Sequence, residues 1–510
     1  MEKEIALELR NISKYFGSVV ANKGVNLTVY KGEILSLLGE NGSGKTTLMN
    51  MISGIYFPDE GQIFVNGEEV VIRSPLDAFK YKIGMIHQHF KLVDVFTAAQ
   101  NIVLGVKDGK RFNLKDVNAR VKEISDRYGF NIDPKKKIYD MSVSEKQTVE
   151  IVKVLYRGAD ILILDEPTAV LTPQETEKLF AVLRKMKEDG KAIIIITHKL
   201  HEVLSVSDRV SVLRKGEYIG SVNTAETNES QLTEMMVGKK VELNIERPDP
   251  VDSHPKLVVE HLTCKDKEGI TTLDDVSFQA YTGEILGVAG ISGAGQRELL
   301  ESIAGLEYAY PRSSILYYTD EGEEEELVGR SPKEIRDMGV ALSFVPEDRL
   351  GMGLVGSMGM ADNMMLKSYT KGKTPFVERK APTALAEEIR ENLEVVTPGI
   401  GTPVSKLSGG NVQKVLVGRE IASAPQLLMV AYPVRGLDIN SSYLIYDLLN
   451  EQKKKGVSVI FVGEDLDVLI ELCDRIMVLS SGKITGIVEG KKATKEELGL
   501  LMTQKEGANE

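Results

Sequence analysis

The sequence predicts an α/β protein built from two homologous domains in tandem. Three observations lead to this fold class. An internal repeat covers most of the 510 residues, short apolar segments alternate with helical stretches in each half, and a glycine-rich loop joins one apolar segment to a helix. One apolar segment, Ile161–Leu164, is uninterrupted, as expected for a strand buried on both faces of a mainly parallel sheet.

The internal repeat consists of three pairs of matching segments. The pairs are Val25–Ile55 with Val276–Leu306, the segment from Met141 with the segment from Leu407, and Ser207–Gly220 with Cys473–Gly486. A junction with three prolines and several charged residues separates the two halves. We therefore expect a first domain at 1–241, a linker at 242–256, a second domain at 257–497 and a C-terminal tail at 498–510.

Composition excludes several classes of protein. The formal net charge is −12 and no basic face is evident, so nucleic acid is not an expected partner. The two cysteines, Cys264 and Cys473, lie far apart, which argues against a disulfide framework or a cysteine-based zinc site. The charged N-terminus does not resemble a signal peptide, and no window reaches the ~18–20 apolar residues of a membrane span. We expect a cytoplasmic protein.

A phosphate-binding loop is the clearest local motif. It follows the apolar strand Ile34–Leu38 and opens a helical stretch, and this strand–loop–helix context separates a real loop from a chance match. Its glycines let backbone N–H groups face phosphate oxygens, and the helix N-terminus adds partial positive charge. Lys45 is expected to reach the β- and γ-phosphates, and the Thr46 hydroxyl to bind Mg²⁺. The expected nucleotide-binding residues here are Gly39, Glu40, Asn41, Gly42, Ser43, Gly44, Lys45, Thr46 and Thr47.

Two adjacent carboxylates, Asp165 and Glu166, end the buried apolar segment. We interpret Asp165 as the group that positions Mg²⁺ through a water molecule, and Glu166 as the base that polarises an attacking water. General-base assistance contributes about 10²–10⁴ in rate, so loss of Glu166 is expected to leave binding intact and remove turnover. The alternative, two acids that cap a helix, is weakened by their place downstream of a phosphate-binding loop.

The order of the motifs resembles the nucleotide-binding domain of ABC transporters, and the match covers essentially all of both halves. The resemblance implies ATP and Mg²⁺ as ligands. It also implies that each parallel core sheet carries an antiparallel β part and a helical subdomain, and that the two domains pack head to tail. Gln88 matches the glutamine that senses Mg²⁺ and couples to the membrane subunit, and His198 matches the switch histidine that contacts the γ-phosphate.

Phe16 matches the aromatic residue that stacks on adenine in this family. Tyr15 is an alternative for that role, and a core aromatic is a further interpretation of Phe16. His87 and His89 flank Gln88 and invite a metal interpretation. Because no third ligand lies nearby, we interpret these two histidines as loop surface.

The second half carries the family's signature sequence, with Ser408, Gly409 and Gly410 at the start of an expected helix. In a head-to-tail pair, each ATP lies between the phosphate-binding loop of one domain and the signature of the other. A second helix N-terminus then completes the anion site. Asp438 keeps the aspartate of the family's D-loop, whereas the first half has Thr172 at that position.

The second half has lost the groups that bind and hydrolyse ATP. Its signature partner in the first half is also degenerate, because Val143 and Ser144 replace both glycines. The defects therefore fall in one composite site, and we expect one hydrolysable ATP per chain. The replacements are Gln296 for Lys45, Arg297 for Thr46, Glu347 for Gln88, Ala431 for Asp165, Tyr432 for Glu166 and Glu464 for His198.

Fused pairs with a degenerate second site resemble the energising subunit of the importers for simple sugars and nucleosides, with the nucleoside branch favoured by Ile83–Gly105. The first signature and the Ala431–Tyr432 pair are atypical for that group. The resemblance implies two membrane permease subunits, an extracytoplasmic substrate-binding lipoprotein as an indirect partner, and a peripheral location on the cytoplasmic face of the membrane. The alternative is a soluble tandem ABC ATPase that acts on ribosomes. Such proteins have two intact sites and a long basic arm between domains.

Overall fold

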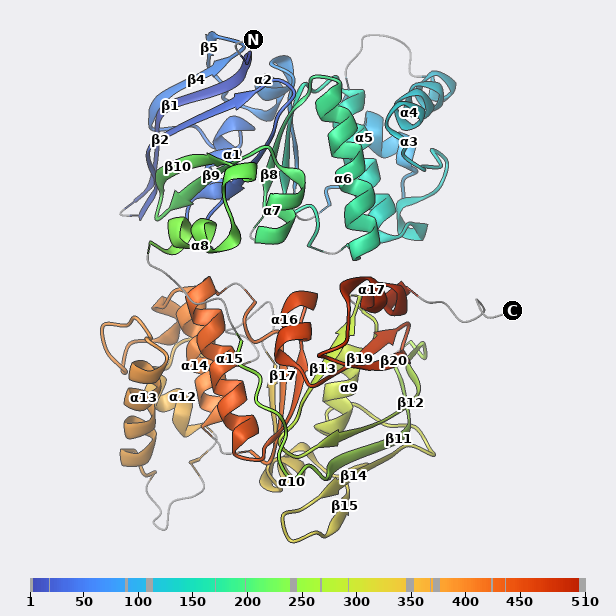
Figure 1. Cartoon of the computed structure of the whole chain (residues 1–510), viewed down its shortest axis with the longest axis vertical. Helices are drawn as coiled ribbons and strands as arrows, with labels where there is room; N and C mark the ends of the chain where they lie inside the picture. The colour runs from blue at the N-terminus through green and yellow to red at the C-terminus, as the bar shows by residue number, and fades with distance from the viewer. Residues whose placement is uncertain are drawn as a thin grey trace. The chain divides into compact units, whose positions relative to one another are not determined.

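The chain folds into two compact units, Met1–Glu242 and Leu243–Glu510, and each is an α/β domain (Figure 1). Each contains a mainly parallel sheet, a smaller antiparallel sheet and a group of helices. The predicted fold class is therefore confirmed. The computed structural model describes the chain except for residues 1–2, 18, 88–89, 107–112, 170, 198, 239–244, 267, 292, 345–352, 367, 370–376, 423–424, 436 and 504–510.

The main sheet of the first unit has the strand order β10-β9-β3-β8-β7-β6. All neighbours pair in parallel except β10, which pairs antiparallel with β9 at one edge. The central strands β3, β7 and β8 are buried along their whole length, which explains their unbroken aliphatic sequences. The strands are β3 Ile34–Leu38, β6 Ile83–Ile86, β7 Ile161–Asp165, β8 Ala192–Ile196, β9 Arg209–Arg214 and β10 Glu217–Asn223.

The antiparallel sheet of the first unit has the order β2-β1-β4-β5. Its apolar side chains share a core with helix α1 and one face of the main sheet; Leu7, Val25, Leu48 and Ile163 belong to this core. The packing places the helix that follows the phosphate-binding loop between the two sheets. The strands are β1 Ile5–Phe16, β2 Val19–Tyr30, β4 Glu60–Val65 and β5 Glu68–Val70.

Helices cover the other face of the main sheet. α5 and α6 share a core with β7 and β8 that includes Ile151, Phe180 and Ile193. α3 and α4 pack on α5 around Ile102 and Val121, and in Figure 1 they lie beyond α5, away from the antiparallel strands. They form the expected helical subdomain. The helices are α1 Lys45–Ile52, α2 Pro75–Lys80, α3 Ala98–Val103, α4 Leu114–Tyr128, η1 Ile138–Asp140, α5 Val143–Tyr156, α6 Pro173–Glu188, α7 Leu200–Val206, η2 Thr224–Glu226 and α8 Glu229–Val237.

The second unit repeats this topology strand for strand. Its main sheet has the order β16-β17-β18-β13-β19-β20, and its antiparallel sheet has the order β12-β11-β14-β15. The strands are β11 Pro255–Lys265, β12 Thr271–Tyr281, β13 Ile285–Gly290, β14 Ser314–Tyr318, β15 Glu324–Glu326, β16 Val340–Phe344, β17 Leu427–Ala431, β18 Ser458–Val462, β19 Arg475–Ser480 and β20 Lys483–Glu489. The helices are α9 Gln296–Ile303, α10 Pro332–Asp337, α12 Met360–Met365, α13 Lys380–Asn392, η3 Val404–Lys406, α14 Gly409–Ile421, α15 Ile439–Lys454, α16 Leu466–Leu472 and α17 Lys495–Thr503.

The segment that precedes β11 is attached to the second unit. Ile245 is buried in the core of that unit, and Arg247 donates a hydrogen bond to the carbonyl of Ile470 (2.8 Å). Asn450 on α15 donates to the carbonyl of Glu246 (2.7 Å). Residues 245–247 of the expected linker therefore pack as part of the second unit.

The C-terminal helix α17 also belongs to the second unit. It spans the expected boundary at residue 497, and Leu498 is fully buried in the core. The second unit thus continues at least to Thr503, beyond the point where a tail was expected. Among the described helices, none is both long enough and apolar enough to cross a bilayer.

Candidate nucleotide site

The phosphate-binding loop lies at the carboxyl edge of the main sheet, between β3 and α1. Gly44 precedes α1 with a positive φ of 95°, and a Cβ atom there would lie 2.4 Å from the carbonyl oxygen of Ala21. A Cβ atom on Gly39 would lie 2.3 Å from the carbonyl oxygen of Leu213 and 2.4 Å from Ser43 Oγ. Only glycine therefore allows the backbone to pass through both positions.

Lys45 is buried beneath this loop, with 7% of its surface exposed. Its ammonium group donates hydrogen bonds to the carbonyls of Gly39 (2.7 Å) and Glu40 (3.0 Å). Burial lowers the pKa of Lys45, and the nearby carboxylates of Glu166 and Asp165 oppose that effect. The structure thus brings the loop lysine and the two predicted carboxylates within electrostatic reach of one another.

Asp165 and Glu166 lie at the end of β7, at the same edge as the loop. Burial raises the pKa of Asp165 to about 6, the Glu166 carboxylate adds to the rise, and Lys45 opposes it. Glu166 has a left-handed backbone with φ of 48°, and its N–H donates to the carbonyl of Ile196 on β8 (2.8 Å). This anchor turns the chain as it leaves the sheet, so Asp165 ends the strand and Glu166 lies outside it.

The Ser43 hydroxyl is buried in the loop and has no hydrogen-bond partner among the described residues. A buried hydroxyl without a partner is costly unless a ligand satisfies it. Together with a buried cation and two carboxylates, this atom fits a site for a phosphate and a divalent cation.

Three predicted site residues, Gln88, His198 and Glu347, lie outside the described residues. The strands that precede Gln88 and His198, β6 and β8, end at Ile86 and Ile196. Both strands pair in parallel with β7, so their carboxyl ends share the edge that carries Asp165.

Phe16 lies at the end of β1 with 43% of its surface exposed, so the interpretation as a core aromatic is wrong. Its ring makes an edge contact with Tyr56 (centroids 5.3 Å apart), and Lys14 lies 5.5 Å from its centroid. Tyr15 is also exposed, at 38%. Tyr56 follows the C-terminal end of α1, whereas the loop precedes the N-terminal end of this helix, and the sequence gives no signal for its contact with Phe16.

The second unit repeats the backbone conformation found at Glu166 and carries different side chains at the equivalent positions. Tyr432 has a left-handed φ of 53° and donates from its N–H to the carbonyl of Val462 (2.9 Å), as Glu166 does in the first unit. Gln296 is buried and donates to the carbonyl of Ile291 (3.1 Å). Arg297 forms an ion pair with Glu301 one turn further along α9 (2.7 Å).

An ion pair joins two further positions of the second unit. Glu464, at the position of the switch histidine, lies 3.6 Å from Arg435. Burial raises the pKa of Tyr432, and the Glu464 carboxylate contributes to the rise. Tyr432 is therefore neutral at physiological pH, and neither it nor Ala431 can replace the paired carboxylates.

The two signature segments both begin a helix with a serine cap, but they differ in charge. Ser408 caps α14 and also accepts a hydrogen bond from the side chain of Asn411 (2.9 Å). Ser142 caps α5, and the Glu145 carboxylate folds back to accept from the Ser142 N–H (2.7 Å). A carboxylate, ion-paired with Lys136 (2.7 Å), therefore occupies the start of α5 in addition to the loss of the two glycines. The neutral asparagine at the start of α14 leaves that helix terminus favourable for an anion.

Asp438 has a structural role that its sequence position did not reveal. Its carboxylate caps α15 by accepting from the N–H and the hydroxyl of Ser441 (2.9 and 2.7 Å). Thr172 caps α6 in the same way through Glu175. Helix capping therefore accounts for both side chains, and the assignment of Asp438 to the nucleotide site stays a prediction.

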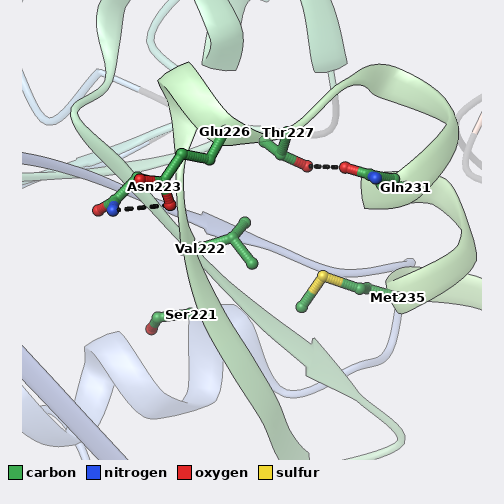
Figure 2. A pocket seen from close by; sticks show the side chains of 7 residues that line it. All are labelled: Ser221, Val222, Asn223, Glu226, Thr227, Gln231 and Met235. Carbon is green, nitrogen blue, oxygen red and sulfur yellow. Dashed lines mark hydrogen bonds between the residues drawn. The ribbon is translucent and has the colours of Figure 1, made fainter.

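A pocket between β10 and α8 lies apart from this machinery (Figure 2). Its polar side chains bond to one another, Asn223 to Glu226 and Thr227 to Gln231, each at 3.1 Å. None of the predicted site residues lines it.

The fold and the candidate site together define a P-loop ATPase with two tandem domains. The sequence profile described as "ABC transporter" matches residues 22–169 and 273–433. The chain belongs to the ABC transporter family, and it is a transporter-type ATPase that binds ATP.

Curated relatives match over nearly the whole chain. The nucleoside import ATP-binding protein of Lactococcus lactis is 41% identical over 98% of this chain and 99% of its own length. The guanosine import ATP-binding protein of Bacillus subtilis is 42% identical over 99% of both chains. A ribose import ATP-binding protein of Rubrobacter xylanophilus is 38% identical over 98% of this chain and 99% of its own.

Proposed function

We propose that this chain is the ATP-hydrolysing subunit of an importer for nucleosides or simple sugars, with one competent and one degenerate ATP site. The observation that carries the proposal is the contrast between Glu166 and Tyr432. The backbone conformation and anchor are the same at both positions, yet only the first supplies a carboxylate. The names of the relatives support import as the process, with nucleosides favoured, and give no support to a ribosome-acting ATPase.

The competent site is a composite of both halves. The first half contributes the loop around Lys45, the carboxylates of Asp165 and Glu166, and His198. The second half contributes Ser408, Gly409 and Gly410 in a head-to-tail arrangement. The absence of a carboxylate at the start of α14 supports this partner, because a phosphate group approaches that helix terminus without repulsion. The second, degenerate site would combine Gln296 and Tyr432 of the second half with the N-terminus of α5 in the first half, where the Glu145 carboxylate lies.

Mg²⁺ fits the first site better than the second. Thr46, Gln88 and Asp165 would hold it, and the metal would supply neutralisation of charge on the phosphates. Asp165 is buried within electrostatic reach of Glu166 and Lys45, so two carboxylates lie near a single lysine, and this arrangement supports a further cation. Ala431 leaves no such group in the second site.

In the proposed mechanism, hydrolysis uses this chain's own groups. Lys45 and the loop N–H groups bind and orient the phosphates, and burial of Lys45 strengthens that interaction. Glu166 accepts a proton from the attacking water, and His198 contacts the γ-phosphate. Closure of the two halves on ATP is passed to two permease subunits on the cytoplasmic face of the membrane, which receive substrate from a binding lipoprotein.

The test is the steady-state ATPase rate of the full chain with matched substitutions at the equivalent positions. Glu166→Gln is expected to lose about 10²-fold or more in turnover while ATP binding persists. Tyr432→Phe, its counterpart in the second half, is expected to change turnover little. Near-normal turnover of Glu166→Gln would overturn the assignment of the site. Uptake of labelled nucleosides against labelled ribose in cells that carry the complete transporter then identifies the substrate class.

A further inference from the structure

A buried polar cluster joins the two loops that carry the proposed catalytic residues. Glu202 on α7 has 4% of its surface exposed, and Thr168, two residues after Glu166, has 1% exposed. The Thr168 hydroxyl donates to Glu202 Oε2 (2.6 Å). Lys199, which directly follows His198, pairs with Glu202 Oε1 (3.1 Å).

Further hydrogen bonds tie this cluster to the backbone on both sides. Lys199 Nζ also donates to the carbonyl oxygen of Thr168 (3.5 Å), and its N–H donates to the Thr197 hydroxyl (3.2 Å). On the other side, the N–H of Ala169 donates to the carbonyl of Glu166 (3.3 Å). A single buried carboxylate thus bridges the turn after β7 and the segment after β8.

The second unit lacks this bridge. The equivalent positions are Val434 for Thr168, Asp465 for Lys199 and Val468 for Glu202. Both valines pack against the apolar core of that unit, and the same two loops are joined there by the more exposed ion pair of Arg435 with Glu464 (3.6 Å) rather than by a buried carboxylate. A buried charge is costly unless it is paired and hydrogen-bonded, and an apolar alternative evidently suits this fold. The stability of the fold therefore does not by itself account for the polar residues Thr168 and Glu202 in the first unit.

We propose that Glu202 is a positioning residue for ATP hydrolysis, which acts with Thr168 and Lys199 to hold the Glu166 loop in register with the segment of His198. The inference rests on the proposed function of the first half. A charged, directional bridge fixes the separation of the two loops more tightly than apolar side chains at the same positions would, because hydrogen bonds have defined lengths and angles. Catalysis needs such fixed geometry for the base and the γ-phosphate contact, whereas ATP binding by the phosphate loop does not.

The test measures kcat and KM for ATP with the full chain carrying Thr168→Val, Glu202→Gln or both. Thr168→Val keeps the shape and removes the donor, and Glu202→Gln keeps the size and removes the charge that pairs with Lys199. Each single variant is expected to lose about tenfold in kcat, on the scale of one hydrogen bond to a charged group, with KM unchanged. The double variant is expected to have a kcat no lower than that of the slower single variant, because the two substitutions remove the same hydrogen-bonded bridge.

Two controls separate positioning from a general loss of structure. Thr168→Ser keeps the hydroxyl and is expected to retain kcat, and Ser205→Ala removes a hydroxyl that bonds within α7 and is expected to leave kcat unchanged.

The proposal is overturned if Thr168→Val and Glu202→Gln both keep wild-type kcat, or if Thr168→Ser is as slow as Thr168→Val. Glu166→Gln is measured in parallel: if it is inactive while the bridge variants are normal, only this inference fails. Activity of Glu166→Gln would instead remove the proposed function.

Discussion

Asp165 should make the first domain less stable at neutral pH than an isosteric amide at the same position. Its pKa rises from an ordinary 3.8 to about 6 in the folded protein, chiefly because of burial. Each pKa unit corresponds to about 1.4 kcal/mol, so the ionised side chain costs the folded state about 3 kcal/mol well above pH 6. Asp165→Asn removes that cost. For a domain of this size, the corresponding rise in melting temperature is roughly 5–10 °C.

The sign of the pH dependence follows from the direction of the shift. The folded state binds the proton of Asp165 more tightly than the unfolded state does, so the wild type loses stability as pH rises from 3.8 to about 6. Below pH 3.8 the carboxyl is neutral in both states, and the advantage of Asp165→Asn disappears.

The assay is urea or thermal unfolding of the full chain without nucleotide or Mg²⁺, at about pH 8 and at about pH 4. Asp160→Asn is the matched control, because ion pairs with Lys82 and Lys191 hold the pKa of Asp160 below its usual value. That control should destabilise the protein where Asp165→Asn stabilises it. Equal stability of Asp165→Asn and wild type at pH 8 would refute the reasoning. Addition of MgATP should stabilise the wild type more than the variant.

Three further outcomes are expected from the site. Phe16→Ala should raise KM for ATP several-fold, consistent with about 1 kcal/mol for an aromatic contact, and Tyr15→Ala should change it less; the opposite order of KM values would assign the base contact to Tyr15. Gly44→Ala should weaken nucleotide binding and lower the melting temperature, because the new Cβ meets the carbonyl of Ala21 at 2.4 Å; unchanged binding of a fluorescent ATP analogue would contradict this. Glu145→Asn should leave steady-state ATPase activity unchanged, because the proposed function assigns Glu145 to the degenerate site; a large change in rate would place it in the working site.

The fold and the first-half site could be predicted from sequence because each depends on local patterns. Unbroken aliphatic runs identify buried parallel strands, and the spacing of glycines around Lys45 identifies a phosphate loop. The equivalence of Glu166 and Tyr432 also follows from the repeat. Their shared left-handed backbone and their hydrogen bond to the neighbouring strand cannot be predicted in this way. The bond joins segments that are far apart in the chain, and no residue type in either segment indicates it.

Other features depend on contacts between segments far apart in the chain. Tyr56 meets Phe16 only because α1 packs beneath the antiparallel sheet. Thr168 and Glu202 meet because β7 and β8 are neighbours, and a threonine and a glutamate at those positions resemble ordinary capping residues. Sequence pattern placed the second domain's end at 497, but burial of Leu498 on α17 shows that an amphipathic helix with a charged first turn still contributes to the core.

The central claim is that the working site draws its signature from the second half. Ser408 and Ser142 both cap a signature helix, so alanine at either position costs a similar ~1 kcal/mol of helix stability. The direct measurement is the kcat for ATP of Ser408→Ala beside that of Ser142→Ala in the full chain. The account predicts a large loss of kcat for Ser408→Ala and nearly normal kcat for Ser142→Ala. The reverse order, or equal losses, would contradict it.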